Sequence, residues 1–287
     1  MKVIVDFGCN EGQNIKYFLS KADIVYVFDA NKKLCDEIKV NFKKELKNKK
    51  LFVENLAILG GVSNNSHIDF YIHKEGSPSS SVYPELTGDP LNKFIKTRVK
   101  ARKASSILNE IRNNLKIDIF EYIKIDIEGA DKFVLKDILE NNIYSNYLSV
   151  ECIDFEIIEL LKSSLYKSFK FIEGFEFEKI KNIVIEDKNG NKAIKSFDVH
   201  SSGPYGDDIP GNYYDKNSLV PYILNNGLGW KDIHCCFEDK VLNPTLTYNR
   251  EIHNQGFKYH LRQLYPSFKK MIKNRIYLIY RNIKKEN

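Results

Sequence analysis

The sequence VIVDFGCNEG, residues 3–12, begins as a short apolar run and ends in a turn that contains two glycines. A helical pattern follows, so this stretch predicts a buried strand, a tight turn and a helix, which is how a nucleotide-binding unit of parallel strands begins. Gly8 and Gly12 let the backbone adopt positive φ and approach a ligand closely. The spacing D-x-G-x-x-x-G differs from the G-x-G-x-x-G of dinucleotide-binding proteins, whose glycines cradle a pyrophosphate.

The acid ahead of the first glycine indicates a different ligand. A carboxylate at Asp6 repels phosphate but accepts hydrogen bonds from an ammonium or ribose group. S-adenosylmethionine (SAM) carries an amino acid and a sulfonium group and no phosphate, so it suits this turn. We expect Asp6 and Asn10 to hydrogen-bond SAM while Gly8 and Gly12 shape the loop. The alternative is an ordinary strand, turn and helix with incidental glycines.

The first half of the chain alternates in the way that predicts parallel β/α units. Strands are predicted at residues 3–6, 24–29, 51–57, 67–73, 98–103, 120–126 and 147–152, and helices at 12–20, 31–47, 105–114, 129–140 and 155–165. Ser105 is the expected N-cap of its helix. Residues 169–177 and 180–186 are typical of a hairpin. We expect an α/β fold, a doubly wound, mostly parallel sheet of Rossmann-like type.

Two strand ends carry candidate binding residues, because ligands bind at the carboxyl edge of open α/β sheets. Asp29 ends the second strand about 20 residues beyond the glycine turn, where an acid accepts both ribose hydroxyls. This feature is shared with NAD enzymes, so it supports a ribose ligand without choosing the cofactor. Ala57, at the end of the third strand, is a weaker candidate for contact with the adenine edge.

Candidate catalytic residues follow a second buried strand. In YIKIDIEGAD, residues 122–131, Asp126 and Glu128 come at the carboxyl end of the strand, just before a helix. They suit a general base and an orienting acceptor, or else they cap the helix and pair with Lys124. His200 is a further candidate base, although a lone histidine at a strand end is more often structural.

Four segments resemble the FkbM family of SAM-dependent methyltransferases: VDFGCNEG, YVFDAN, GSPSSSV and above all YIKIDIEGAD. The resemblance covers roughly residues 3–175. It implies a class I methyltransferase fold, SAM as cofactor, and O-methylation of a sugar or polyketide hydroxyl. It implies SAM binding by Asp6, Gly8, Asn10, Gly12 and Asp29, and a place beside the cofactor for Ser80, Ser81, Asp126 and Glu128. The family more often has Glu at position 29, and it commonly has a Leu-Asp pair where this chain has residues 103–107, KASSI.

The alternation of predicted strands and helices ends near residue 200, where a turn-rich stretch begins. We expect a methyltransferase domain over residues 1–200 and a C-terminal cap or extension over 201–287. Asp207 and Asp208, with the aromatic residues around them (Tyr205, Tyr213, Tyr214 and Trp230), predict either a sugar site or an ordinary packed loop. Residues 267–285 predict a basic amphipathic helix, which packs on its own domain, docks on a partner protein or lies on an anionic membrane surface.

The composition of the chain indicates which cellular compartment and which partners to expect. The 287 residues are 43% hydrophobic and 29% charged, and no stretch is long and apolar enough to span a bilayer. Five cysteines without C-x-x-C spacing predict neither a zinc site nor a disulfide framework. We therefore expect a cytoplasmic protein, either free or at the inner membrane surface. The net charge is +6, but the acidic site edge disfavours nucleic acid as a partner.

These observations favour a SAM-dependent O-methyltransferase. The expected acceptor is a hydroxyl of a free, nucleotide-linked or polymeric sugar, or of a related polyhydroxylated compound, in surface-polysaccharide biosynthesis. A non-catalytic scaffold with the same fold is the first alternative. A nicotinamide-dependent oxidoreductase is the second, and the D-x-G-x-x-x-G spacing argues against it.

Overall fold

The computed structural model describes residues 1–61, 66–75, 80–84, 90–152, 154–173, 180–197, 201–227 and 231–249. The chain divides into two compact units, one comprising Met1–Lys216 with Leu228–Thr245, the other Asn217–Gly227 with Leu246–Asn287. The first unit holds the main sheet and its helices, and α7 (Leu219–Asn226) belongs to the second. The expected division at residue 200 stays a prediction. The predicted tail helix lies outside the described residues.

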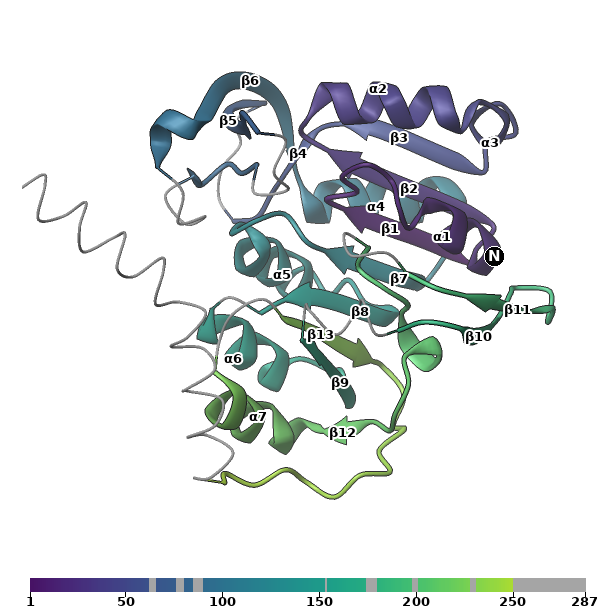
Figure 1. Cartoon of the computed structure of the whole chain (residues 1–287), viewed down its shortest axis with the longest axis vertical. Coiled ribbons are helices and arrows are strands. Elements are labelled where there is room, and N and C mark those ends of the chain that lie inside the picture. Colours follow the sequence, from purple (N-terminus) through teal and green to yellow (C-terminus); the bar gives the residue numbers. More distant parts are fainter. Residues whose placement is uncertain are drawn as a thin grey trace, which may run out of the picture. The chain divides into compact units, whose positions relative to one another are not determined.

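The main sheet has eight strands in the order β12-β9-β13-β8-β7-β1-β2-β3 (Figure 1). Their bounds are β1 Val3–Phe7, β2 Ile24–Asp29, β3 Leu51–Asn55, β7 Phe120–Ile125, β8 Ser145–Glu151, β9 Ser168–Glu173, β12 Tyr214–Asp215 and β13 Lys231–Cys236. Strands β3, β2, β1, β7 and β8 are parallel, β13 runs antiparallel to both of its neighbours, and β12 runs antiparallel to β9. The expected α/β fold with a mostly parallel, doubly wound sheet is confirmed.

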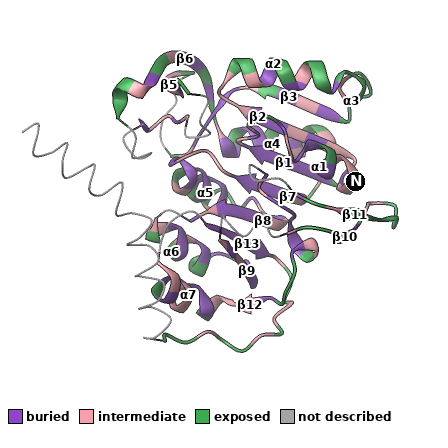
Figure 2. Ribbon diagram, viewed as in Figure 1, coloured by how far each residue is buried: buried purple, intermediate pink, exposed green. Residues whose placement is uncertain are grey.

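The centre of the sheet is buried on both faces, as the apolar run of β1 predicts. All five residues of β1 are buried, and Figure 2 shows the central strands mostly in purple, the colour of buried residues. The connecting helices are α1 Ile15–Lys21, α2 Lys32–Asn41, α3 Lys43–Lys47, α4 Ala104–Leu115, α5 Asp131–Glu140 and α6 Phe155–Ser163. Ile15 and Phe18 of α1 and Ile38 of α2 share one core cluster with Tyr122 of β7. Because the chain leaves β1 toward β2 and returns to β7 on its other side, a crevice for a ligand is expected at the carboxyl ends of β1 and β7.

A smaller sheet adjoins this region. It has three strands in the order β4-β6-β5, with bounds Ala57–Leu59, Phe94–Lys103 and His67–His73. The predicted strand at residues 51–57 is therefore two strands, β3 and β4. The expected serine cap of α4 is wrong, because the helix begins at Ala104 and the backbone N–H of Ser105 donates to the Asp137 carboxylate at 2.7 Å.

The hairpin predicted for residues 169–186 is also wrong. β9 pairs with β13 and β12, whereas β10 (Ile183–Glu186) pairs with β11 (Lys192–Lys195). The strand β13 comes from the region expected to be an irregular cap. All six of its residues are buried, and three of them are polar (Lys231, Asp232 and His234), so it lacks the apolar run of a typical core strand.

Two findings bear on compartment and membrane contact. All five cysteines are free and buried. Within the described part of the chain, no helix combines the length and apolar character that crossing a bilayer requires.

Candidate active site

The turn after β1 is pressed against the end of β7. Gly8 has a φ of +89°, and a Cβ atom there would lie 1.7 Å from the carbonyl oxygen of Asp126. The backbone N–H groups of Gly8 and Cys9 both donate to the carbonyl of Phe28, at 3.0 and 3.1 Å. Gly8 is therefore required both by its backbone conformation and by the close approach of two strand ends.

Gly12 has a different role. Its φ is +79°, and a Cβ atom there would lie 2.8 Å from the side chain of Ile15 and 3.0 Å from that of Ile38. Gly12 thus lets the turn pack onto α1 and α2, and it is not among the residues that line the cavity described below.

Asp29 connects the glycine turn to the end of β2. One oxygen of its carboxylate accepts the backbone N–H of Asn10 at 2.9 Å, and the other accepts that of Asn31 at 2.8 Å. Burial raises the pKa of Asp29 to about 6, against the two hydrogen bonds, which lower it. Each carboxylate oxygen has a second lone pair, so Asp29 can also accept hydroxyl groups from a ligand.

A cavity of about 380 Å³ opens at the carboxyl ends of β1, β2 and β7. It brings together seven of the predicted site residues: Gly8, Asn10, Asp29, Ala57, Ser80, Asp126 and Glu128. Its apolar walls include Phe28, Leu34, Leu56, Ile58, Phe70, Ile72 and Ile127. Asp6, Gly12 and Ser81 do not line it, and His200 lies outside the described residues.

Asp6 is buried beneath the cavity. Its side chain is 2% exposed and forms an ion pair with Lys124 at 3.2 Å. Burial raises the pKa of Asp6 to about 6, although Lys124 lowers it. The same ammonium group pairs with Asp126 at 3.0 Å and donates to the carbonyl of Gly8 at 2.9 Å. Lys124 therefore holds the glycine turn and the end of β7 together, and Asp6 supports it.

The loop after β7 has a constrained backbone. Glu128 has a φ of +54°, a left-handed conformation that costs energy for a residue other than glycine. The Ser81 hydroxyl donates to the carbonyl of Glu128, and the Asp131 carboxylate accepts the N–H groups of Ile127 and Gly129 at 3.0 and 2.9 Å. Ser81 and Asp131 thus orient Glu128 from outside the cavity.

The two predicted catalytic carboxylates, Asp126 and Glu128, have different electrostatic surroundings. Asp126 is paired with Lys124, as one alternative from the sequence predicted, and it is Asp131 that binds the N–H groups ahead of α5. Glu128 forms no ion pair with any residue in the described ranges. Burial, and then the charge of Asp126, raises the pKa of Glu128 to about 8.

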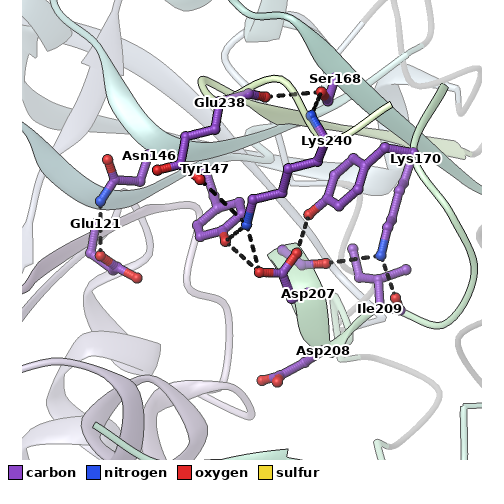
Figure 3. A network of polar contacts seen from close by, with 12 residues as sticks. Glu121, Asn146, Tyr147, Ser168, Lys170, Asp207, Asp208, Ile209, Glu238 and Lys240 are labelled. Carbon is purple, nitrogen blue, oxygen red and sulfur yellow. Dashed lines mark hydrogen bonds and ion pairs between the residues drawn. The ribbon is translucent and has the colours of Figure 1, made fainter. Parts of the chain in front are cut away.

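The residues predicted as a sugar site belong to another part of the fold. Asp207 accepts hydrogen bonds from Tyr147 at 2.8 Å, Tyr213 at 3.1 Å and Lys240 at 2.7 Å (Figure 3). Tyr147 lies four residues before the end of β8, so this network lies about 13 Å along the strand from the carboxyl edge. Asp207 anchors the chain to the amino end of the sheet, which corresponds to the packed-loop alternative.

Neighbouring residues complete this anchor. Asp208 accepts a hydrogen bond from Tyr17 at 2.6 Å and pairs with Lys21 at 2.8 Å. The ring of Tyr205 is stacked on that of Tyr122, with centroids 4.2 Å apart. Trp230 lies outside the described residues.

Comparisons with known proteins give similarity of structure only. No protein-family model and no curated protein matches this chain. The chain is similar to the methyltransferase FkbM from Methylobacillus flagellatus, with 12% identity and a TM-score of 0.36, over 60% of this chain and 40% of that chain. It is also similar to an rRNA methylase from Streptococcus thermophilus, with 9% identity and a TM-score of 0.35, over 60% of this chain and 76% of that chain.

The residues of the cavity fit SAM. The Asp29 carboxylate suits the ribose hydroxyls, and the apolar walls suit an aromatic base. Glu11, Asp126 and Glu128 bring carboxyl groups to the same cavity, which suits a ligand with an ammonium and a sulfonium charge. Within the described residues, no group of histidine, cysteine and acidic side chains is arranged to hold a metal ion.

Proposed function

We propose that the protein is a SAM-dependent O-methyltransferase that acts on a hydroxyl of a sugar or a related polyhydroxylated acceptor. The observation that carries this proposal is one cavity that joins the glycine turn, the Asp29 carboxylate and the carboxyl groups of Asp126 and Glu128. A role in surface-polysaccharide biosynthesis in the cytoplasm accords with such an acceptor. Contact of the tail with a membrane surface or a partner protein stays a prediction.

The cofactor-binding residues have separate tasks in this proposal. Asp29 accepts the ribose hydroxyls, and Leu56 and Ala57 lie against the base. Gly8 allows close approach of the methionine part, and Asn10 supplies a polar side chain beside it. When bound, SAM supplies a methyl group already activated by the positive charge on sulfur.

The chain then has to align the acceptor and accept its proton. Alignment of two reactants within about 3 Å is the larger contribution to the rate. Partial removal of the hydroxyl proton adds ~10²–10⁴-fold. Glu128 suits proton acceptance better than Asp126, because Lys124 pairs with Asp126, whereas Glu128 forms no ion pair within the described residues. Burial raises the pKa of Glu128, so its ionised form is a strong base for a carboxylate. Asp126 is then the orienting acceptor, and His200 remains a candidate outside the described residues.

Calorimetric titration with SAM and, separately, with NADH tests the cofactor. We expect micromolar binding of SAM that Asp29→Ala abolishes. Asp36→Ala is the matched control, because Asp36 is an exposed acid of α2 that pairs with Lys32 on the same helix. A folded protein that binds NADH and not SAM would support the oxidoreductase instead.

Turnover tests the reaction. Methyl-labelled SAM is incubated with a panel of monosaccharides and nucleotide-linked sugars, and labelled products are sought. We expect transfer that Glu128→Gln reduces by at least about 100-fold. SAM binding without transfer to any hydroxylated acceptor would support the non-catalytic scaffold.

A further inference from the structure

Three carboxyl groups form a row across adjacent strands beside the proposed SAM cavity. The register that pairs Ile125 with Val150 places Asp126 next to Glu151, and Asp232 of β13 lies directly opposite Glu151. Paired residues of neighbouring strands point to the same face of a sheet. The row therefore lies on one face, at the edge where Asp126 lines the cavity.

The charges around this row do not balance. Asp126 and Asp131 add negative charge near both Glu151 and Asp232, and Glu128 adds more near Glu151 when it is ionised. Lys124 is the cation that faces Asp232, and it is already paired with Asp6 and Asp126. Lys231 is adjacent to Asp232 in sequence, so it points to the opposite face, where it pairs with Glu173 at 3.2 Å.

The surroundings of Asp232 give the strongest indication that this row of carboxyl groups binds a ligand. The residue as a whole is 7% exposed, yet its side chain makes no hydrogen bond or ion pair with any residue in the described parts of the chain. A buried carboxyl group without a partner is costly, so a ligand that supplies hydrogen bonds would offset that cost. Burial, and then Asp126, raises the pKa of Asp232 to about 8 and also raises that of Glu151.

We propose that Glu151 and Asp232 form an acceptor-recognition pair that shares a proton, binds hydroxyls of a neutral or cationic sugar and excludes an acceptor with a carboxylate or phosphate beside the reacting hydroxyl. This inference rests on the proposed function and specifies its substrate class. The protonated member donates a hydrogen bond to the sugar and the ionised member accepts one. An anionic group there would meet uncompensated negative charge in a site of low dielectric.

Glu151 and Asp232 take no part in the bonds that form and break during methyl transfer. The acceptor oxygen forms a bond to the methyl carbon, the carbon–sulfur bond breaks with its electron pair on sulfur, and the hydroxyl proton passes to Glu128. Glu151 and Asp232 hold a neighbouring hydroxyl of the acceptor and keep their single shared proton. They act as specificity and positioning residues.

Sugar binding is measured by saturation-transfer NMR with glucose, glucosamine and glucuronate, both with and without S-adenosylhomocysteine. We expect wild-type protein to bind glucose and glucosamine about 10–100-fold more tightly than glucuronate. The double variant Glu151→Gln/Asp232→Asn should reduce that discrimination to less than about threefold. Glu156→Gln, which alters a half-exposed acid of α6, is the matched control and should retain it.

Several results would overturn the proposal. These are equal binding of glucuronate and glucose by wild-type protein, unchanged discrimination in the double variant, and no binding of any of the three sugars. SAM affinity of the double variant, measured by calorimetry, should equal that of wild-type protein and also shows that the variant is folded. Absence of SAM binding in wild-type protein would instead refute the proposed function, and the titrations without S-adenosylhomocysteine would still test the pair.

Discussion

Gly8→Ala should destabilise the protein far more than the same change at another glycine with the same φ angle. Gly8 and Gly211 both have a φ of +89°. A Cβ atom at Gly8 would lie 1.7 Å from the carbonyl oxygen of Asp126, whereas one at Gly211 would have no atom within 4 Å. The pair therefore separates the cost of the φ angle from the cost of the contact.

The expected magnitudes follow from these two costs. A left-handed conformation costs alanine ~1–2 kcal/mol, and this applies to both variants. Inserting a methyl group into a packed site costs ~1–3 kcal/mol more. At Gly8 the obstacle is backbone, which cannot rotate away, so the upper end applies. We expect Gly211→Ala to lose ~1–2 kcal/mol of unfolding free energy and Gly8→Ala ~4–5 kcal/mol.

Urea denaturation of both variants, at unchanged m-value, measures the difference. Calorimetry with SAM gives a second measure, because displacing the end of β7 also moves the cavity wall. We expect Gly8→Ala to bind SAM at least about tenfold more weakly and Gly211→Ala to bind it normally. Equal losses of stability in the two variants would refute the inferred close contact between the glycine turn and β7.

Two further predictions concern the polar groups away from the cavity. Asp207→Ala removes the acceptor shared by Tyr147, Tyr213 and Lys240. Because Asp207 is exposed, urea denaturation should show that only ~1 kcal/mol of unfolding free energy is lost. Unchanged affinity for SAM and sugars would confirm that the role of Asp207 is structural. Burial holds the pKa of His234 at about 3, below its value of ~6.5 in the unfolded chain, so stability is lost as pH falls from 6.5 toward 3. Between pH 7 and pH 5, wild-type protein should lose about 2 kcal/mol more than His234→Gln. Parallel stability curves for those two proteins would show that His234 is protonated in the fold.

The sequence predicts which strand ends meet at the cavity, for a topological reason. Residues 3–12 and 120–128 encode strands that are buried on both faces, and parallel strands bring their carboxyl ends to one edge. Gly8, Asn10, Asp29, Asp126 and Glu128 therefore meet without any knowledge of side-chain packing. The same reasoning does not distinguish residues that face the cavity from those beneath it. Asp6 points to Lys124 because of the register between β1 and β7, which no local pattern specifies.

Strand partners are harder to predict than strands. Residues 231–236, KDIHCC, interleave charged and apolar residues, so their burial depends on the neighbours that β8 and β9 provide. Without this partner, the pattern of residues 169–186 favours a hairpin. No local pattern joins Glu151 to Asp232 either, since they become neighbours only through the pairing of β13 with β8.

The position of β13 has a consequence for biosynthesis. β8 ends at Glu151 and β9 follows at Ser168, but the strand that lies between them begins only at Lys231. Until the ribosome has released that segment, β8 and β9 each present an open edge that invites aggregation. A chain that ended at residue 200 would lack β13 and leave those edges of β8 and β9 unpaired. A nascent chain stalled before residue 231 would keep both edges open and would therefore be prone to aggregate.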